Sequence, residues 1–150
     1  MIEERISKDY VDAMKQRDSL RSSTLNFLRA QIKNVLIDKK AEKLEDVDVI
    51  VVIKKQIKQR QDSISQFKDA NRDDLVEKET KELNILKTYL PEELPEEEIK
   101  TLVTEAIEEV GASSMKDMGR VMKIIAEKVQ GRADNKLVSE LVKKGILGNN

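Results

Sequence analysis

The stretch Leu90-Pro91-Glu92-Glu93-Leu94-Pro95 decides the organisation of this chain, because it contains both of the prolines in the sequence. Proline lacks a backbone N–H and restricts the residue before it, so helices end at or before such a segment. On either side of it, apolar residues recur at the spacings of three and four that are typical of amphipathic helices. The stretch therefore predicts a short, stiff linker at residues 91–94, between helical domains at 1–90 and 95–150.

The composition favours helices throughout the chain. Among 150 residues there are only 5 Gly and 2 Pro, which is too few for a meander of short strands. The abundant Lys, Glu, Leu, Ala, Met and Gln all favour helix, and the 39% of hydrophobic residues can supply a modest core. We therefore predict an all-α protein, with a four-helix N-terminal domain followed by a small three-helix C-terminal domain.

Four helical patterns precede the linker. Residues 49–53 are β-branched enough to resemble a strand, but the helical spacing continues for about five turns, so we predict a helix there. The charged residues 38–43 are predicted to form a solvated turn, and Pro91 is expected to end the fourth helix. The first helix is expected to start at Ile2 and the fourth at Asp73 or Asp74, and Asp18 and Asp48 are the expected N-caps of the second and third.

Three further helical patterns follow the linker. Each is bounded by residues that favour helix ends. The acids that follow Pro95 lie where the helix dipole favours negative charge. The expected boundary residues are Pro95 in the first turn of the fifth helix, Gly111 after it, Ser114 with Asp117 as a capping box, Gly131 after the sixth helix, and Asp134 as N-cap of the last.

The residue types that are missing exclude much of the usual chemistry. The sequence has no Cys and no His, which removes disulfides, thiolate nucleophiles, imidazole bases and the commonest zinc ligands. It also lacks the GxxxxGK[ST] and GxGxxG phosphate-binding patterns. We therefore expect no catalytic residue, no metal site and no cofactor.

The N-terminus and the hydropathy pattern bear on location. Met1-Ile2-Glu3-Glu4-Arg5 carries early acids and precedes no apolar signal region. No run approaches the roughly 20 apolar residues that a membrane span requires. These features predict a cytoplasmic location and no membrane partner.

Charge is distributed unevenly along the C-terminal domain. Residues 91–110 contain eight acids and one Lys (net −7), whereas residues 111–150 contain eight Lys or Arg and four acids (net +4). The basic residues lie opposite the apolar stripes of the last two predicted helices, where they either meet an anion or form ordinary solvated helix faces. The candidate RNA-binding residues on these helices and in the loop between them are Lys116, Arg120, Lys123, Arg132, Lys136 and Lys143.

The segment Gly131-Arg132-Ala133-Asp134 lies between the last two predicted helices. Its backbone amides and the following helix N-terminus can bind a phosphate, or the segment is a C-cap followed by an N-cap. Aromatic residues make up only 3% of the chain, which argues against a base-stacking platform. Any RNA contact is therefore expected to use shape and backbone.

Several ordered strings resemble a known family over essentially the whole chain. In the C-terminal domain they include the motif positions Gly119, Met122, Gly131, Ala133 and Asp134. The strings are Ala13-Met14-Lys15, Asp18, Arg21, Leu25, Leu28-Arg29, Arg72, Asp74-Leu75, Glu79, Glu82-Leu83, Tyr89-Leu90-Pro91, residues 117–123, residues 131–134 and residues 136–142. They resemble the YqeY proteins, whose C-terminal domain is similar to the tail of the B subunit of the glutamyl/aspartyl-tRNA amidotransferase.

The resemblance implies a function as well as a fold. The amidotransferase tail contacts the outer elbow of tRNA, so the resemblance implies a non-catalytic accessory module that binds tRNA weakly through its C-terminal domain. A tRNA-aminoacylation or amidotransferase protein is an implied partner. Two alternatives stay open: a protein–protein adaptor, and a carbon–nitrogen ligase with glutamine as amido-N-donor. The ligase is implied by family kinship alone, because the amidotransferase active site lies in a larger domain without a counterpart here.

Overall fold

The computed structural model of the chain describes residues 1–148, so the last two residues of the predicted C-terminal domain, Asn149 and Asn150, lie outside them. The described part contains seven α-helices, one short 3-10 helix and no strand, which confirms the all-α prediction. The chain divides into two compact units, Met1–Leu90 and Pro91–Asn150, called here the N-terminal unit and the C-terminal unit. Each is described by itself.

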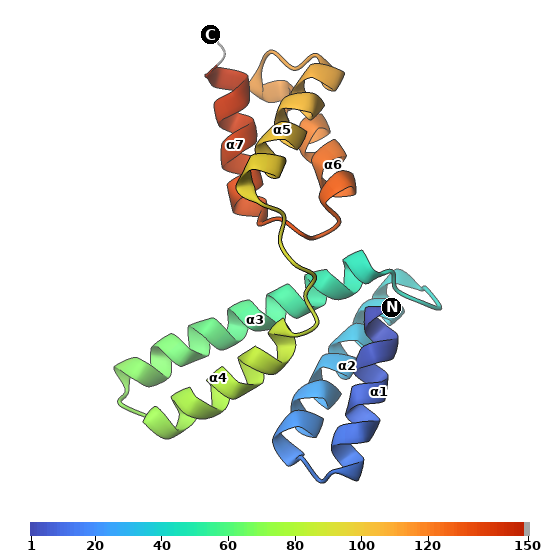
Figure 1. Cartoon of the computed structure of the whole chain (residues 1–150), viewed down its shortest axis with the longest axis vertical. Helices are drawn as coiled ribbons and strands as arrows, with labels where there is room; N and C mark the ends of the chain where they lie inside the picture. Colours follow the sequence, from blue (N-terminus) through green and yellow to red (C-terminus); the bar gives the residue numbers. More distant parts are fainter. Residues whose placement is uncertain (149–150) are drawn as a thin grey trace. The chain divides into compact units, whose positions relative to one another are not determined.

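The N-terminal unit consists of two helical hairpins (Figure 1). Its helices are α1 (Ile2–Lys15), α2 (Ser19–Lys39), α3 (Asp46–Asp69) and α4 (Asp73–Lys87). Helix α1 packs on α2 and α3 packs on α4, and the hairpins meet through contacts of α2 with both α3 and α4. The C-terminal part of α3 and the start of α4 extend beyond this contact as a separate arm (Figure 1).

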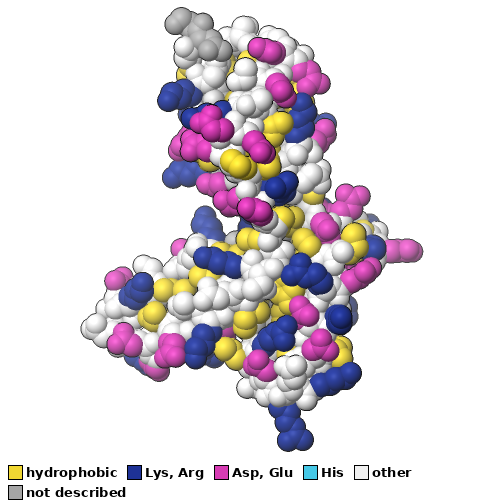
Figure 2. Space-filling model, in the orientation of Figure 1, with side chains coloured by type: hydrophobic (Ala, Val, Ile, Leu, Met, Phe, Trp, Pro, Cys, Tyr) yellow, Lys and Arg dark blue, Asp and Glu magenta, His cyan; other side chains and the backbone are white. Residues whose placement is uncertain are grey.

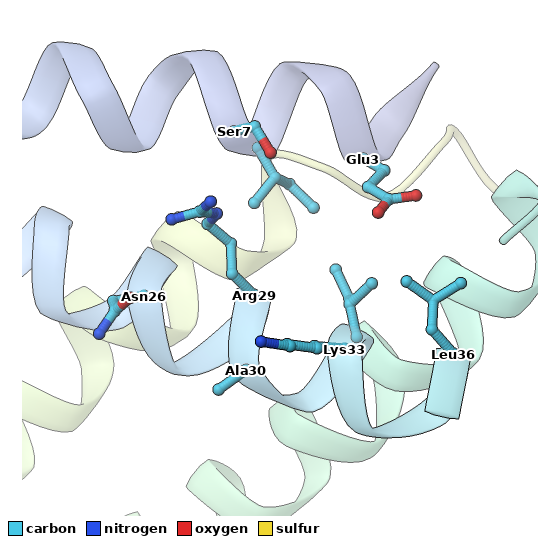
Figure 3. Close-up of a pocket in the computed structure, with 9 residues that line it drawn as sticks. Glu3, Ser7, Asn26, Arg29, Ala30, Lys33 and Leu36 are labelled. Atoms are coloured by element: carbon cyan, nitrogen blue, oxygen red, sulfur yellow. The ribbon is translucent and has the colours of Figure 1, made fainter. Parts of the chain in front are cut away.

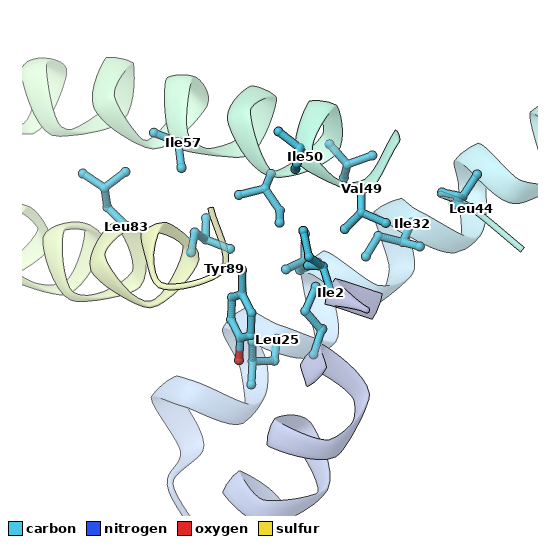
Figure 4. Close-up of a cluster of buried hydrophobic side chains, with 14 residues drawn as sticks. Ile2, Leu25, Ile32, Leu44, Val49, Ile50, Ile57, Leu83 and Tyr89 are labelled. Carbon is cyan, nitrogen blue, oxygen red and sulfur yellow. The ribbon is translucent and has the colours of Figure 1, made fainter. Parts of the chain in front are cut away.

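The core of the N-terminal unit lies where the two hairpins meet (Figure 4). It draws on the first half of α1, the middle of α2, the first half of α3 and the end of α4. Three of its residues were missed from the sequence, namely Leu44 before α3 (2% exposed), Ile50 in α3 (3%) and Tyr89 after α4 (2%). The buried members are Ile2, Ile6, Leu25, Leu28, Ile32, Leu44, Val49, Ile50, Val52, Ile53, Ile57, Leu83, Leu86 and Tyr89.

Three predicted helix boundaries can be compared with the structure. Asp18 caps α2 as expected, because its carboxylate accepts a hydrogen bond from the Arg21 N–H. The prediction that Asp48 is the N-cap of α3 was wrong: the N-cap residue is Glu45, α3 begins at Asp46, and the Asp48 carboxylate accepts a hydrogen bond from Lys39 Nζ at 2.6 Å instead. Helix α4 ends at Lys87, and the amides of Thr88, Tyr89 and Leu90 bond to the carbonyl three residues back instead of four, which tightens the last turn before Pro91.

The C-terminal unit packs α5 (Glu96–Val110), α6 (Met118–Val129) and α7 (Asn135–Leu147) around an aliphatic core. Asp134 caps α7 as predicted. The capping box of Ser114 and Asp117 is present, but it opens a 3-10 helix, η1 (Met115–Asp117), that precedes α6. The buried core residues are Ile99, Val103, Ala106, Ile107, Val121, Ile125, Val129, Ala133, Val138, Val142 and Ile146.

Several of the helices end in residues with left-handed backbone conformation. Gly111 has a φ of 68° and ends α5 as predicted. Residues with side chains adopt the same conformation after other helices, including Arg17 (φ 55°), Lys40 (φ 52°) and Gln130 (φ 50°). Glycine favours this region because it has no Cβ, so these three helix ends form without the residue best suited to them.

Candidate nucleic-acid interface on the C-terminal unit

The structure places five of the six candidate basic residues on the two helices and the loop that the sequence predicted, whereas Lys116 lies before α6 and not on it. Lys116 lies in η1, Arg120 and Lys123 lie on α6, and Lys136 and Lys143 lie on α7. These five side chains are exposed. The sixth, Arg132 in the loop between α6 and α7, is only partly exposed.

Arg120 is held close to its own helix start. Its guanidinium donates to Asp117 at 2.5 Å, three residues earlier. Asp117 also accepts backbone hydrogen bonds from Ser113 and Ser114 at 3.1 and 3.4 Å. The pKa of Asp117 lies below its ordinary value, chiefly because of the Ser113 N–H and then because of Arg120. Arg120 thus meets a carboxylate that stays ionised at neutral pH, which reduces its attraction for a second anion.

Arg132 holds the linker against the C-terminal unit. Its Nε donates to the carbonyl oxygen of Glu92 at 2.8 Å, and its own carbonyl accepts a hydrogen bond from the Leu94 N–H at 2.8 Å. The two bonds tie residues 92–94 to the loop between α6 and α7. Arg132 therefore has a structural role that its local sequence did not reveal.

The loop amides that were candidates for binding phosphate are largely occupied. The Arg132 N–H donates to the carbonyl oxygen of Val129 at 2.9 Å, and the Lys136 N–H donates to the Asp134 carboxylate at 3.3 Å. Ala133 is buried in the core. Of the two interpretations of this segment, the structure favours a C-cap followed by an N-cap.

The lysines differ from the arginines in their surroundings. In the part of the chain that the structure describes, Lys116, Lys123, Lys136 and Lys143 form no ion pair within 4.0 Å. Lys144, which sequence reasoning missed although it adjoins Lys143, is exposed and without an ion pair as well. Figure 2 shows that Lys and Arg side chains stand at the surface of this unit beside acidic ones. These five ammonium groups are its available cations.

The N-terminal unit has a polar depression between α1 and α2 (Figure 3). Its volume is about 430 Å³, and its lining includes Ser7, Asn26, Arg29 and Lys33 with Glu3. The Arg29 guanidinium lies 4.5 Å from the centre of the Tyr10 ring, a cation–π contact that fixes its stem. Charges of both signs face this open depression, so it has no clear preference for an anion.

Many of the residues in the family-like strings of the N-terminal unit have a structural contact. Tyr89 Oη donates to Asp9 at 2.6 Å, and Arg21 lies 3.8 Å from the same carboxylate. Burial, and then the hydrogen bond to Asp9, raise the pKa of Tyr89. Glu79 and Glu82 both bind Arg60. These contacts stabilise the fold.

Within residues 1–148, no three or more Asp and Glu side chains are placed to hold a metal ion. None of the described helices combines the length and apolar character needed to cross a bilayer.

Comparison with known proteins identifies the relatives of the chain. The model of the family described as "Yqey-like protein" matches residues 3–146. Proteins named "Altered inheritance of mitochondria protein 41, mitochondrial" are also similar. The one from Vanderwaltozyma polyspora is 34% identical over 75% of this chain and 64% of its own length. The one from Lachancea thermotolerans is 38% identical over 73% and 59%, and the one from Pyrenophora tritici-repentis is 33% identical over 95% and 79%.

These relatives correct one prediction and set a limit. Their names place them in mitochondria, which contradicts the cytoplasmic location predicted from the N-terminal sequence. The chain spans 64% and 59% of the lengths of the first two, so it corresponds to a part of those proteins. The family match, in contrast, covers nearly the whole chain. This chain therefore belongs to the YqeY-like protein family.

Proposed function

We propose that this protein is a non-catalytic accessory module that binds tRNA through the phosphate backbone, using the exposed lysines of its C-terminal unit. One observation carries the proposal: Lys116, Lys123, Lys136 and Lys143 stand on η1, α6 and α7 without a carboxylate partner among the described residues. The resemblance of this unit to the tail of the amidotransferase B subunit supports tRNA as the nucleic acid that the lysines bind.

The chemistry of such a contact is mainly electrostatic. A lysine ammonium that meets a phosphate releases a condensed counterion, and each neutralised phosphate contributes roughly −0.9 to the slope of log affinity against log salt. Three or four contacts predict a slope of about −2 to −4 and a dissociation constant on the order of 10⁻⁴ to 10⁻⁶ M at physiological salt. Sequence preference is expected to be slight, because phosphate contacts do not distinguish bases.

The structure determines which variant tests the proposal cleanly. Arg132→Glu would also remove the hydrogen bond to the Glu92 carbonyl oxygen. Arg120→Glu would replace the ion pair with Asp117 by repulsion between two carboxylates. Lys123→Glu combined with Lys136→Glu changes only exposed side chains that form no ion pair in the described chain. This double variant is expected to keep the fold.

Fluorescence anisotropy with labelled tRNA across a salt series measures the effect. The Lys123→Glu, Lys136→Glu protein should bind more weakly and flatten the salt slope by about two units. The matched control is Lys55→Glu with Lys58→Glu, two exposed lysines of α3, which should leave the slope nearly unchanged. Equal affinity and equal slope for the wild type and the C-terminal variant would contradict the proposal.

A further inference from the structure

The arm of the N-terminal unit is formed by the second half of α3 and the first half of α4. It comprises residues 58–69 and 73–81, which the turn at residues 70–72 joins. Figure 1 shows that it extends beyond the contact of these two helices with α2. No residue from 58 to 81 is fully buried. Near the turn, the two helices therefore have only each other to pack against.

Three large apolar side chains lie beside the turn, and we call them the tip cluster. They are Phe67 on α3 and Leu75 and Val76 on α4, each only partly buried and none part of the core of either unit. The Arg72 N–H donates to the Phe67 carbonyl oxygen at 2.9 Å, so the end of α3 and the start of α4 lie together. Figure 2 shows hydrophobic side chains at the surface of the arm. Because helices bury their apolar residues against another element, the half-covered tip cluster indicates an interaction surface.

The net charge changes sign along the arm. At its base, residues 54–60 contain three Lys, one Arg and no acid (net +4), and the adjacent residues 79–87 of α4 contain two acids and two Lys (net 0). Around the turn, residues 69–78 contain four acids, one Arg and one Lys (net −2). Lys55 and Lys58 at the base are exposed, as are the four acids around the turn. The base is therefore positive and the tip is negative.

This charge pattern is complementary to itself. When two copies of the arm lie side by side in opposite directions, the negative tip of each lies beside the positive base of the other. Opposite charges then meet at both ends of the contact, which favours association in that orientation. Two arms in the same direction would instead bring base against base and tip against tip, and like charges would repel. The occupant that fits the arm is therefore a second copy of the same arm.

We propose that the arm is a self-association surface, on which two copies of this chain pack their arms in opposite directions about a two-fold axis. Each tip cluster then packs on the arm of the other copy, and four helices enclose the apolar side chains as in a four-helix bundle. A two-fold contact uses the same surface on both copies, so it closes at a dimer. This surface lies on the N-terminal unit and does not depend on the tRNA proposal.

Sedimentation velocity of the full chain measures the self-association. Two short helices offer a small surface, so the contact is expected to be weak, and a concentration range of about 5 to 500 µM covers it. The weight-average mass should rise with concentration from that of one chain toward that of two and stop there. A chain that stays monomeric over the whole range would overturn the proposal, and so would growth beyond two copies.

Phe67→Gln tests the tip cluster. Glutamine favours helix, so the variant should keep the fold, which far-UV circular dichroism at the lowest concentration checks. A dimer contains the substitution twice, so the dissociation constant should rise about tenfold or more. The matched control is Val11→Gln on α1, where the side chain is 47% exposed, and it should associate like the wild type. Equal association by Phe67→Gln and the wild type would contradict the proposal, as would an equal loss in the control.

A charge reversal tests the direction of the arms. Asp69→Lys with Glu77→Lys changes exposed side chains only and turns the net charge of residues 69–78 from −2 to +2. Arms in opposite directions then bring lysines against lysines, so the dissociation constant should rise about tenfold. Arms in the same direction would show no such loss, because two tips of either sign repel alike. This variant leaves the tip cluster intact, so it also decides the question should Phe67→Gln unfold the arm.

The control for the charge reversal is Asp38→Lys with Glu42→Lys. These exposed acids at the end of α2 and in the turn after it give the same change of total charge away from the arm, so this variant should associate like the wild type. An equal loss in both charge variants would overturn the assignment to the arm.

The dimer and the tRNA proposal can fail separately. Lys55→Glu with Lys58→Glu makes the base of the arm less positive, so it should weaken self-association and yet leave the salt slope of tRNA binding unchanged. Lys123→Glu with Lys136→Glu should do the reverse. Loss of self-association in this second variant would overturn the assignment of the dimer contact to the arm.

Discussion

The two units of this protein use polar groups in opposite ways. In the N-terminal unit, Thr24, Gln56 and Glu82 are buried among the apolar residues. In the described part of the C-terminal unit, the buried residues are all aliphatic or alanine, and the charges lie outside. Buried polar groups need partners at defined positions, whereas aliphatic packing tolerates substitution of similar volume. The first unit is therefore expected to depend on particular polar contacts for its stability, whereas the second depends on aliphatic packing and leaves its charges on the surface.

The largest expected effect tests whether the units are independent. Ile125→Ala removes a side chain that is 1% exposed and should lower the unfolding free energy of the C-terminal unit by about 2–5 kcal/mol. Both tyrosines, Tyr10 and Tyr89, belong to the N-terminal unit, so their fluorescence follows that unit alone during urea unfolding. The far-UV circular dichroism signal should show an earlier transition, while the tyrosine transition stays in place. A tyrosine transition that moves equally would show that the units unfold together.

A buried charge provides the second test. Glu82→Ala leaves Arg60 with only Glu79 as a partner, in a site where Arg60 and Glu82 have 14% and 9% of their side-chain surface exposed. We expect a loss of about 2–3 kcal/mol in the stability of the N-terminal unit, measured by urea unfolding with tyrosine detection. The control is Glu77→Ala, which removes an exposed partner of Lys81 and should cost less than about 0.5 kcal/mol. Similar losses for the two variants would remove the contrast between buried and surface charges.

The half-buried hydrogen bond of Tyr89 allows the contribution of polar contacts in the N-terminal unit to be tested by its dependence on pH. Tyr89→Phe removes the hydrogen bond to Asp9 and should cost about 1 kcal/mol at neutral pH. Because folding raises the pKa of Tyr89 above its ordinary value of 10.0, the stabilisation is fully present below pH 10 and is lost as the pH rises above it. Urea midpoints of the wild type and the variant should therefore stay apart up to about pH 10 and converge as the pH rises above it. A constant difference would contradict this assignment.

The smallest expected effect concerns the predicted hinge. Arg132→Ala removes one of the two hydrogen bonds that tie residues 92–94 to the C-terminal unit, so a protease specific for glutamate should cut after Glu92 or Glu93 a few times faster. Stability should change by only about 0.5–1 kcal/mol. Lys136→Ala is the control and should leave the cleavage rate unchanged. Preferred cutting inside either unit would argue against a hinge here.

Local sequence patterns predicted the helices well because helix signals are local. The N-caps Asp18 and Asp134 and the end at Gly111 were all recognised from neighbouring residues. The prediction for Asp48 failed because its carboxylate pairs with Lys39 across the turn. Helix α3 begins at Asp46, whose carboxylate accepts a hydrogen bond from the Ile2 N–H at the start of α1. Contacts between residues 44 positions apart leave no local signal.

In the candidate interface, too, features with a local signal were predicted and contacts between distant residues were not. The pattern placed the exposed lysines of α6 and α7 correctly, since the period of a helix determines which side chains lie opposite the core. The pairing of Arg120 with Asp117 was not predicted, although their spacing of three residues is a local signal for it. The bond from Arg132 to Glu92 spans 40 positions and required the fold. The burial of Gln56 without a hydrogen-bond partner in the described chain likewise depends on how the helices pack, so it left no local signal.

The left-handed helix ends at Arg17, Lys40 and Gln130 are positions where the stability of the protein can still be increased. A residue with a Cβ costs roughly 1 kcal/mol or more in that conformation, and glycine avoids the strain at some cost in unfolded-chain entropy. Each of these turns can therefore gain stability from a single substitution that disturbs neither core nor surface recognition. A descendant adapting to a hotter environment has three such positions at which to begin.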